Sequence, residues 1–211
     1  MSSDHPAPEQ PSPLAYMRQK MNQADAMFRH DRPAAGSRAD LVLLARRILS
    51  LCDEVADALP HLSPVAPLAC ARGCDTCCHS LVQVNPLFAA LAVHEARQIF
   101  SPERLHALQE RLASPPPFCP FLFDGSCSIY AARPMVCRGY YSLNLDLCRQ
   151  GEFCEKSLGY QGEHAHAHHQ FMIFLFALEK RLEAIEAELG LSSEPVFLNM
   201  AARALMDEPA L

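Results

Sequence analysis

Cysteine is the residue that most constrains what this chain can fold into. Nine of its ten cysteines lie between Cys70 and Cys154, and only Cys52 lies outside that stretch. The N-terminal residues do not form a charged start followed by an apolar run, so we expect a cytoplasmic protein. Structural disulfides are rare in that reducing compartment, where clustered cysteines indicate metal or redox chemistry. We therefore expect these thiols to build a metal centre.

The clustered cysteines form two groups that are far apart in the chain. In the first group, a Cys-x2-Cys spacing lets two thiolates reach one metal from a single turn. In the second group, the turn dipeptide Asp124-Gly125 should place Cys119 and Cys127 face to face across a hairpin. A site closed by such distant segments would couple metal binding to folding. The predicted metal ligands are Cys70, Cys74, Cys77, Cys78, Cys119, Cys127, Cys137 and Cys148.

The residues around these cysteines follow a specific order. They are Cys74, Cys77, Cys78, Cys119, Pro120, Phe121, Leu122, Gly125, Cys127, Ile129, Tyr130, Arg133, Pro134, Cys137 and Arg138. This order resembles the YkgJ-type cysteine-cluster family, a zinc- or iron-chelating family also known by its CxxCxxCC motif. The spacing departs at the start, where three residues rather than two separate Cys70 from Cys74.

The resemblance covers about residues 70–148 and implies metal binding. The same region is similar to that of the flagellin lysine N-methylases, in which an iron–sulfur cluster is linked to methyl transfer. Those enzymes are longer than this chain. The resemblance therefore implies a metal centre more directly than it implies an enzyme.

The identity of the metal stays open at this point. Zinc takes four ligands in a tetrahedron, and a 4Fe–4S cluster is also held by four cysteines. The eight predicted thiols exceed either need, which leaves two sites, or one cluster with spare thiols. The neighbouring side chains of Cys77 and Cys78 tend to diverge, so they suit two metals or a bridged centre. We favour an iron–sulfur cluster over a zinc or iron ion.

Basic residues and histidines are further candidates. Arg133 and Arg138 flank Cys137, where a cation would lower the pKa of the thiol and stabilise an anionic centre. Alternatively, Arg133 holds the loop by bonding carbonyl groups before Pro134. Further ligand roles stay open for Cys154, His79 and the histidines of the His164–His169 group.

Apolar periodicity predicts a mainly α fold, a helical domain that encloses a loop-rich cysteine knuckle with few or no short strands. Helices are expected over residues 14–30, 40–59, 86–100, 102–113, 163–189 and 194–206, with a short strand or extended segment at 81–84. Pro60 should end the second helix, in which Cys52 should be buried as a small hydrophobe. The expected organisation is a disordered tail (1–13), an N-terminal helical segment (14–68), a cysteine-cluster metal-binding core (69–155) and C-terminal helices packing on that core (156–211).

Charge and motifs narrow the function. A net charge of −6 offers no basic surface for nucleic acid, and the run Phe171–Leu178 is far below the roughly 20 residues that span a bilayer. No phosphate loop, nucleophile elbow or HExxH motif occurs, so the sequence names no substrate or protein partner. Three functions remain: a metal or cluster protein in metal handling, redox sensing or electron transfer; a cluster-dependent modifying enzyme; or a structural zinc module.

Overall fold

A computed structural model of the protein describes residues 11–34, 37–62, 69–114, 117–140, 142–151 and 163–209, with side chains described from Ala167 onward in the last range. The prediction of a mainly α fold with a few short strands is confirmed. Among the residues that the structure describes, no helix combines the length and the apolar character needed to cross a bilayer. Residues 1–10 of the predicted tail and Cys154 lie outside the described residues.

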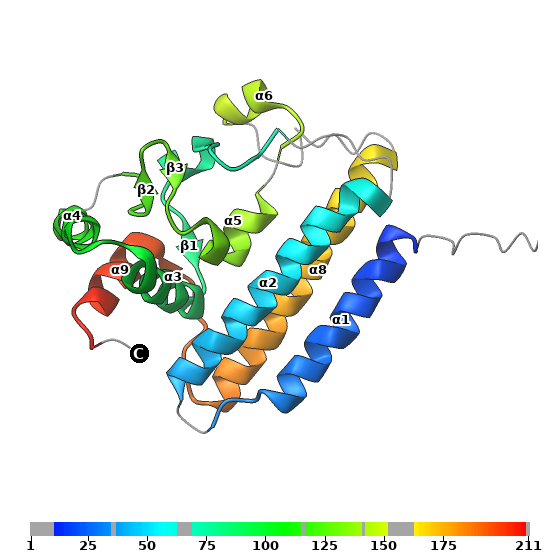
Figure 1. Ribbon diagram of the computed structural model, residues 1–211, viewed down its shortest axis with the longest axis horizontal. Helices are drawn as coiled ribbons and strands as arrows, with labels where there is room; N and C mark the ends of the chain where they lie inside the picture. Colours follow the sequence, from blue (N-terminus) through cyan, green and yellow to red (C-terminus); the bar gives the residue numbers. More distant parts are fainter. Residues whose placement is uncertain are drawn as a thin grey trace, which may run out of the picture.

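Three long helices lie side by side and form a bundle (Figure 1). Ser12 caps the first of them by accepting a hydrogen bond from the Ala15 amide at 3.2 Å. The third ends before Gly190, whose φ of +70° lets the Leu191 amide donate to the Glu186 carbonyl at 2.8 Å. The three helices are α1 (Pro13–His30), α2 (Arg38–Leu62) and α8 (Glu163–Glu188).

Three further helices pack beside the bundle as a second layer (Figure 1). Two of them begin as predicted, with a capping side chain followed by proline: Asn85 accepts from the Leu87 amide at 2.7 Å, and Ser101 accepts from the Arg104 amide at 3.3 Å. The helix that starts after Asn85 joins the two hydrophobic cores, because its residue Phe88 packs into the bundle while Val93 packs into the second layer. These helices are α3 (Pro86–Ile99), α4 (Pro102–Ala113) and α9 (Leu198–Met206).

Two small antiparallel ribbons complete the described structure. β1 (Gln83–Val84) pairs with β4 (Val196–Phe197), which ties the start of α3 to the start of α9. β2 (Leu122–Phe123) pairs with β3 (Ser126–Cys127) across the predicted turn, in which Asp124 and Gly125 have φ angles of 51° and 69°. Two consecutive positive φ angles are typical of the tight turns that match strand twist. The predicted hairpin is therefore confirmed, but its register was predicted wrongly: Leu122 rather than Cys119 lies opposite Cys127, because the strand that pairs with β3 begins three residues after Cys119.

Two expectations about element boundaries were wrong. Pro60 lies inside α2, which continues to Leu62, since a proline in the last turn removes only one of the final helical hydrogen bonds. The loop-rich segment that carries Cys119, Cys127, Cys137 and Cys148 also holds three short helical turns, each too short to show a period: η2 (Tyr130–Ala132), α5 (Met135–Gly139) and α6 (Leu145–Arg149). The last helix begins only at Leu198, because the residues before it pair with β1.

Candidate metal centre

Apart from Cys52, which lies in α2, the described cysteines lie on or next to short elements rather than on the long helices. Figure 1 shows the β2–β3 hairpin, α5 and α6 in the same region of the molecule. Local turns fix most of the thiols, since η1 (Thr76–His79) is a single tight turn and the hairpin pairs Leu122 with Cys127. Cys77 and Cys78 lie on η1, Cys70 and Cys74 precede it, Cys119 and Cys127 belong to the hairpin region, Cys137 lies on α5 and Cys148 on α6.

Four thiols gather where η1 meets the hairpin and α5. We call Cys78, Cys119, Cys127 and Cys137 the inner thiol group. The Cys119 amide donates to the Cys78 carbonyl at 2.7 Å, and the interaction of the two side chains raises the pKa of Cys78. Cys78 and Cys127 both interact electrostatically with Cys137. The amide contact between Cys119 and Cys78 joins the first cysteine segment to the second, and Cys77 lies next to Cys78.

Three other thiols gather beside α6. We call Cys70, Cys74 and Cys148 the outer thiol group. Cys70 interacts electrostatically with both of the others, and its sulfur accepts a hydrogen bond from the Ser142 amide at 3.1 Å. Cys77 also interacts with Cys70 and Cys148, so it lies between the two groups. The predicted ligands thus fall into two groups, and the structure places Cys70 and Cys74 with Cys148 rather than with the hairpin.

The environment raises the pKa of several of these thiols, so they stay protonated near neutral pH when no metal is bound. Burial raises the pKa of Cys70 to about 11, and the hydrogen bond to Cys119, together with burial, raises that of Cys78 to about 12. Burial and the neighbouring sulfurs also raise the pKa of Cys137. A metal must therefore displace protons in order to bind, and its affinity should increase with pH.

Arg138 holds the loop that carries Cys137. Its side chain is buried, with 5% of the residue exposed, and it donates to the carbonyls of Ala131 at 2.8 Å and Arg133 at 3.1 Å. It also forms an ion pair with Asp53 of α2. These contacts attach the segment before α5 to the long helix of the bundle, so Arg138 positions the cysteine next to it.

Arg133 fits both of the roles considered for it. Its guanidinium lies 3.8 Å from the centre of the Tyr130 ring and donates to the Tyr130 carbonyl at 3.4 Å, so it helps to hold the loop. It also lowers the pKa of Cys77, Cys127 and Cys137, against the stronger effects that raise it. A cation therefore lies beside the thiols, where it would offset the negative charge of thiolates.

Two arginines of α4 hold the hairpin, and no motif in the sequence marks either of them. Arg111 donates to the Pro120 carbonyl at 3.0 Å and stacks 3.9 Å from the centre of the Phe123 ring. Arg104 pairs with Asp124 of the turn at 2.7 Å. The hairpin that carries Cys119 and Cys127 is thereby fixed to the second helical layer, before any metal is considered.

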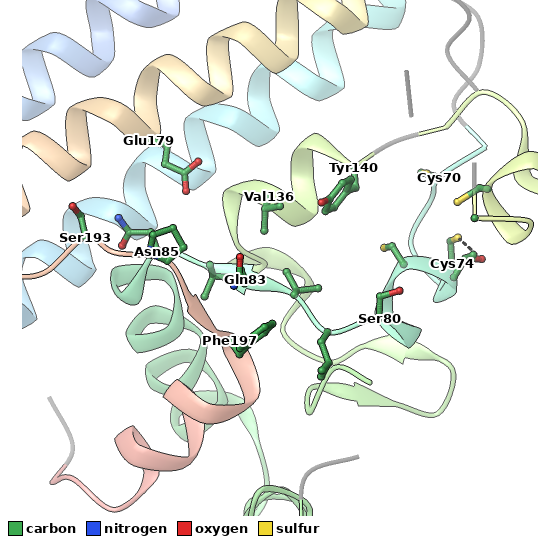
Figure 2. A pocket seen from close by; sticks show the side chains of 18 of the residues that line it. Cys70, Cys74, Ser80, Gln83, Asn85, Val136, Tyr140, Glu179, Ser193 and Phe197 are labelled. Atoms are coloured by element: carbon green, nitrogen blue, oxygen red, sulfur yellow. Dashed lines mark hydrogen bonds between the residues drawn. The ribbon is translucent and has the colours of Figure 1, made fainter. Parts of the chain in front are cut away.

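A cavity of about 880 Å³ extends from the outer thiol group toward α8. Figure 2 shows Cys70 and Cys74 at one end and Glu179 and Asn85 at the other. Burial and nearby Glu183 raise the pKa of Glu179. The wall of the cavity is largely apolar, and the cysteines that line it are Cys70, Cys74, Cys77 and Cys148.

The remaining candidates are placed as follows. His79 lies 3.1 Å from a carboxylate oxygen of Asp75 and is largely exposed. Of the histidine group, the side chains of His164 and His166 lie outside the described ones, whereas His168 is buried. Cys52 is fully buried in α2 as predicted, and burial raises its pKa to about 12.

All nine cysteines within the described ranges are free thiols. In that same part of the chain, no three histidine, cysteine, aspartate or glutamate side chains converge closely enough to hold a metal ion. A metal could therefore bind to three or more of these thiols only if their side chains moved closer together.

No protein-family model, curated protein or solved structure matches this chain significantly. The likeness to the YkgJ-type family therefore stays a prediction that depends on the motif residues themselves.

Proposed function

We propose that this protein binds a metal centre through cysteine thiolates from two distant segments of its chain. The supporting observation is the inner thiol group, in which Cys78 of η1 contacts Cys119 beside the hairpin, with Cys127 and Cys137 close by. Four thiolates match the ligand set of either a 4Fe–4S cluster or a zinc ion. We favour the iron–sulfur cluster and a role in metal handling, redox sensing or electron transfer.

The chemistry of the surroundings supports this proposal. Four thiolates around one centre bring negative charge, and the cation of Arg133 lies where it would offset part of that charge. The hairpin is held by α4 and the Cys137 loop is held by Arg138. A centre bound here would add to these contacts and stabilise the fold, because its ligands come from segments that the unfolded chain does not hold together.

Metal and sulfide analysis after anaerobic purification tests the proposal. We expect a coloured protein that contains iron and acid-labile sulfide, and loss of both in the double variant Cys119→Ser, Cys127→Ser. The matched control is Cys52→Ala, which removes a thiol buried in α2 and should keep the full metal content. Stoichiometric zinc without iron or sulfide would instead support the structural zinc module. A folded wild-type protein without metal would refute metal binding altogether.

The cavity supports a second candidate, a cluster-dependent modifying enzyme. Ligand sites are commonly concave and largely apolar, with volumes of about 300–1,000 Å³. The cavity beside the outer thiol group falls in that range and places four cysteines at its wall. Titration calorimetry of the metal-loaded protein with S-adenosylmethionine tests this candidate. Saturable binding would support the enzyme, whereas the absence of a heat of binding would refute the methyl-transfer hypothesis.

A further inference from the structure

One edge of β1 is unpaired within the described part of the chain. On the other edge, Val84 pairs with Val196 of β4, and the Leu198 amide donates to the Val82 carbonyl at 2.9 Å. Residues of an antiparallel strand alternate between hydrogen-bonded and non-hydrogen-bonded positions. Gln83 is the non-bonded residue between Val82 and Val84, so its N–H and C=O groups point away from β4. Among the described residues, no other strand lies beside β1 to receive these groups.

This unpaired edge runs along the cavity beside the outer thiol group. All residues from 80 to 85 line the cavity, and Gln83 is exposed. In Figure 2, Ser80 lies near Cys74 at one end, whereas Asn85 lies near Glu179 at the other. An added strand lies about 4.7–4.9 Å from its neighbour. A cavity of about 880 Å³ along this edge therefore has room for a few residues of extended chain.

Exposed apolar side chains surround the same cavity. Leu81, Tyr140 and Phe197 line it, and 51%, 44% and 39% of these residues are exposed. Val136 and Tyr140 come from α5, so the cavity lies between this helix and the β1 segment (Figure 2). Exposed apolar side chains gathered in one place mark surfaces where another molecule binds. The cavity thus offers apolar contacts beside the unpaired edge.

The end of the cavity at α8 is acidic. Glu179 and Glu183 line it, one helical turn apart. Lys180 pairs with Glu183 at 2.6 Å, whereas no ion pair to Glu179 is formed among the described residues. The lysine therefore balances only one of the two carboxyl groups, and the remaining negative charge complements a cation. A cation beside Glu179 would also offset the effect of burial, which raises the pKa of that carboxyl group.

We propose that this cavity binds an extended peptide segment of a partner protein, which adds to β1 as a further strand and directs a basic side chain at Glu179. In strand addition, main-chain hydrogen bonds supply affinity and alternate side chains supply specificity. Asn85, near Glu179 in the cavity, is two residues after Gln83, so the basic residue should lie two positions from the residue opposite Gln83. The inference goes beyond the proposed function, because backbone and carboxyl groups carry it and the metal does not.

Fluorescence anisotropy with a labelled peptide and the full-length protein tests the inference. The probe is acetyl-Arg-Val-Thr-Val-Thr-Val-Arg-amide, which has a basic residue at each end so that it fits either direction of the added strand. Its arginines and threonines share one face of the extended chain. We expect saturable binding, and binding that is weaker by about 10-fold or more when citrulline, which is uncharged, replaces both arginines.

Two N-methylated forms of the probe separate strand addition from simple charge attraction. One form is methylated at its valines and the other at its threonines, so each loses the N–H donors of one strand edge. We expect one form to bind like the unmodified probe and the other to bind at least about 10-fold more weakly, since it leaves the Gln83 carbonyl without a donor. A shift by one residue cannot rescue the weak form, because it would turn the arginines to the opposite face.

Two substitutions of one residue test the protein side of the contact. Gln83→Pro removes the N–H group on the unpaired edge, a position that tolerates proline, while Gln83→Ala keeps that group. Gln83→Pro should weaken probe binding by about 10-fold or more and leave the circular dichroism spectrum and the metal content unchanged. Gln83→Ala should change probe binding by less than about 2-fold. If Gln83→Pro does not fold, the two N-methylated probes still decide the question.

Three results would overturn the inference. Equal binding of the two N-methylated forms, or no binding of the probe, would exclude strand addition. Arginine amide that binds as tightly as the probe would assign the cavity to a small cation instead. A concentration-dependent dimer that Gln83→Pro abolishes would assign the edge to a second copy of this chain. Metal and sulfide analysis is independent of all three results, so failure of this inference is distinguishable from failure of the proposed function.

Discussion

Among single substitutions of the charged residues described above, Arg138→Met should destabilise the loop that carries Cys137 the most. The substitution keeps an apolar stem of similar length but removes every donor. The carbonyls of Ala131 and Arg133 then lose their partner, and a buried polar group without a partner costs about 1–3 kcal/mol. Asp53 also loses its ion pair, at a smaller cost because its side chain is 37% exposed and water can replace the arginine.

The two unpaired carbonyls, at about 1–3 kcal/mol each, together predict a decrease of about 2–6 kcal/mol in the free energy of unfolding. Such a decrease is a large part of the roughly 5–15 kcal/mol that stabilises a typical domain. Urea unfolding of the metal-free protein, followed by circular dichroism, measures it. Metal content should decrease in parallel, because the loop next to Cys137 loses its attachment to α2.

Arg97→Met is the matched control for this experiment. Arg97 also donates to several carbonyls, those of Leu205, Met206 and Glu208 at 3.1, 3.2 and 2.7 Å, but these lie at the end of α9, away from the thiols. It should therefore lower stability while leaving metal content unchanged. If Arg138→Met stayed within about 0.5 kcal/mol of the wild type, as ordinary surface substitutions do, the account of the loop would be wrong.

Three further predictions follow from the thiols and carboxyls. Metal binding near neutral pH should release close to one proton per ligating thiol, because the raised pKa values keep the free thiols protonated. Calorimetry in buffers of different ionisation enthalpy measures the number of protons released, and a value of zero would contradict the prediction. In the metal-free protein, ionisation of Cys52 should lower the free energy of unfolding by about 1.4 kcal/mol per pH unit between pH 8.5 and pH 12, because its pKa is about 8.5 in the unfolded chain and about 12 in the folded protein. Cys52→Ala should remove this contribution to the slope, and identical slopes in the variant and the wild type would refute it. Burial raises the pKa of Glu186 to about 7, against the hydrogen bond from Asn85 at 2.6 Å, so the wild type should lose stability as the pH rises from about 4.5 to about 7. Glu186→Gln should therefore be more stable than the wild type by about 1–3 kcal/mol near pH 7 and equally stable in acid. A stability difference that does not depend on pH would contradict this reasoning.

The long helices and the hairpin could be predicted because their signals are local. Asn85 and Ser101 combine a capping side chain with a following proline, and Asp124-Gly125 favours one turn type whatever surrounds it. The pairing of β1 with β4 could not be predicted in the same way. It joins residues more than a hundred positions apart, and each strand has only two residues.

The separation of the cysteines into an inner and an outer thiol group could not be predicted from the sequence for a similar reason. Spacing suggested that Cys74 acts with Cys77 and Cys78, yet Cys70 and Cys74 lie with Cys148 because Ser142 bonds back to Ala69 and Cys70. Likewise, nothing local marks Arg111 as the residue that holds the hairpin. Residues that connect distant segments leave no periodic or motif signal, whereas residues that start or turn an element do.

X-ray absorption at the metal edge of the anaerobically prepared wild-type protein tests the central claim most directly. If cysteines from the η1 segment and from the hairpin and α5 bind one centre together, the first coordination sphere should consist of sulfur, at about 2.3 Å for a four-thiolate zinc ion or with added iron–iron scattering for a cluster. A coordination sphere of nitrogen and oxygen would contradict the claim, because these thiols would then not be the ligands.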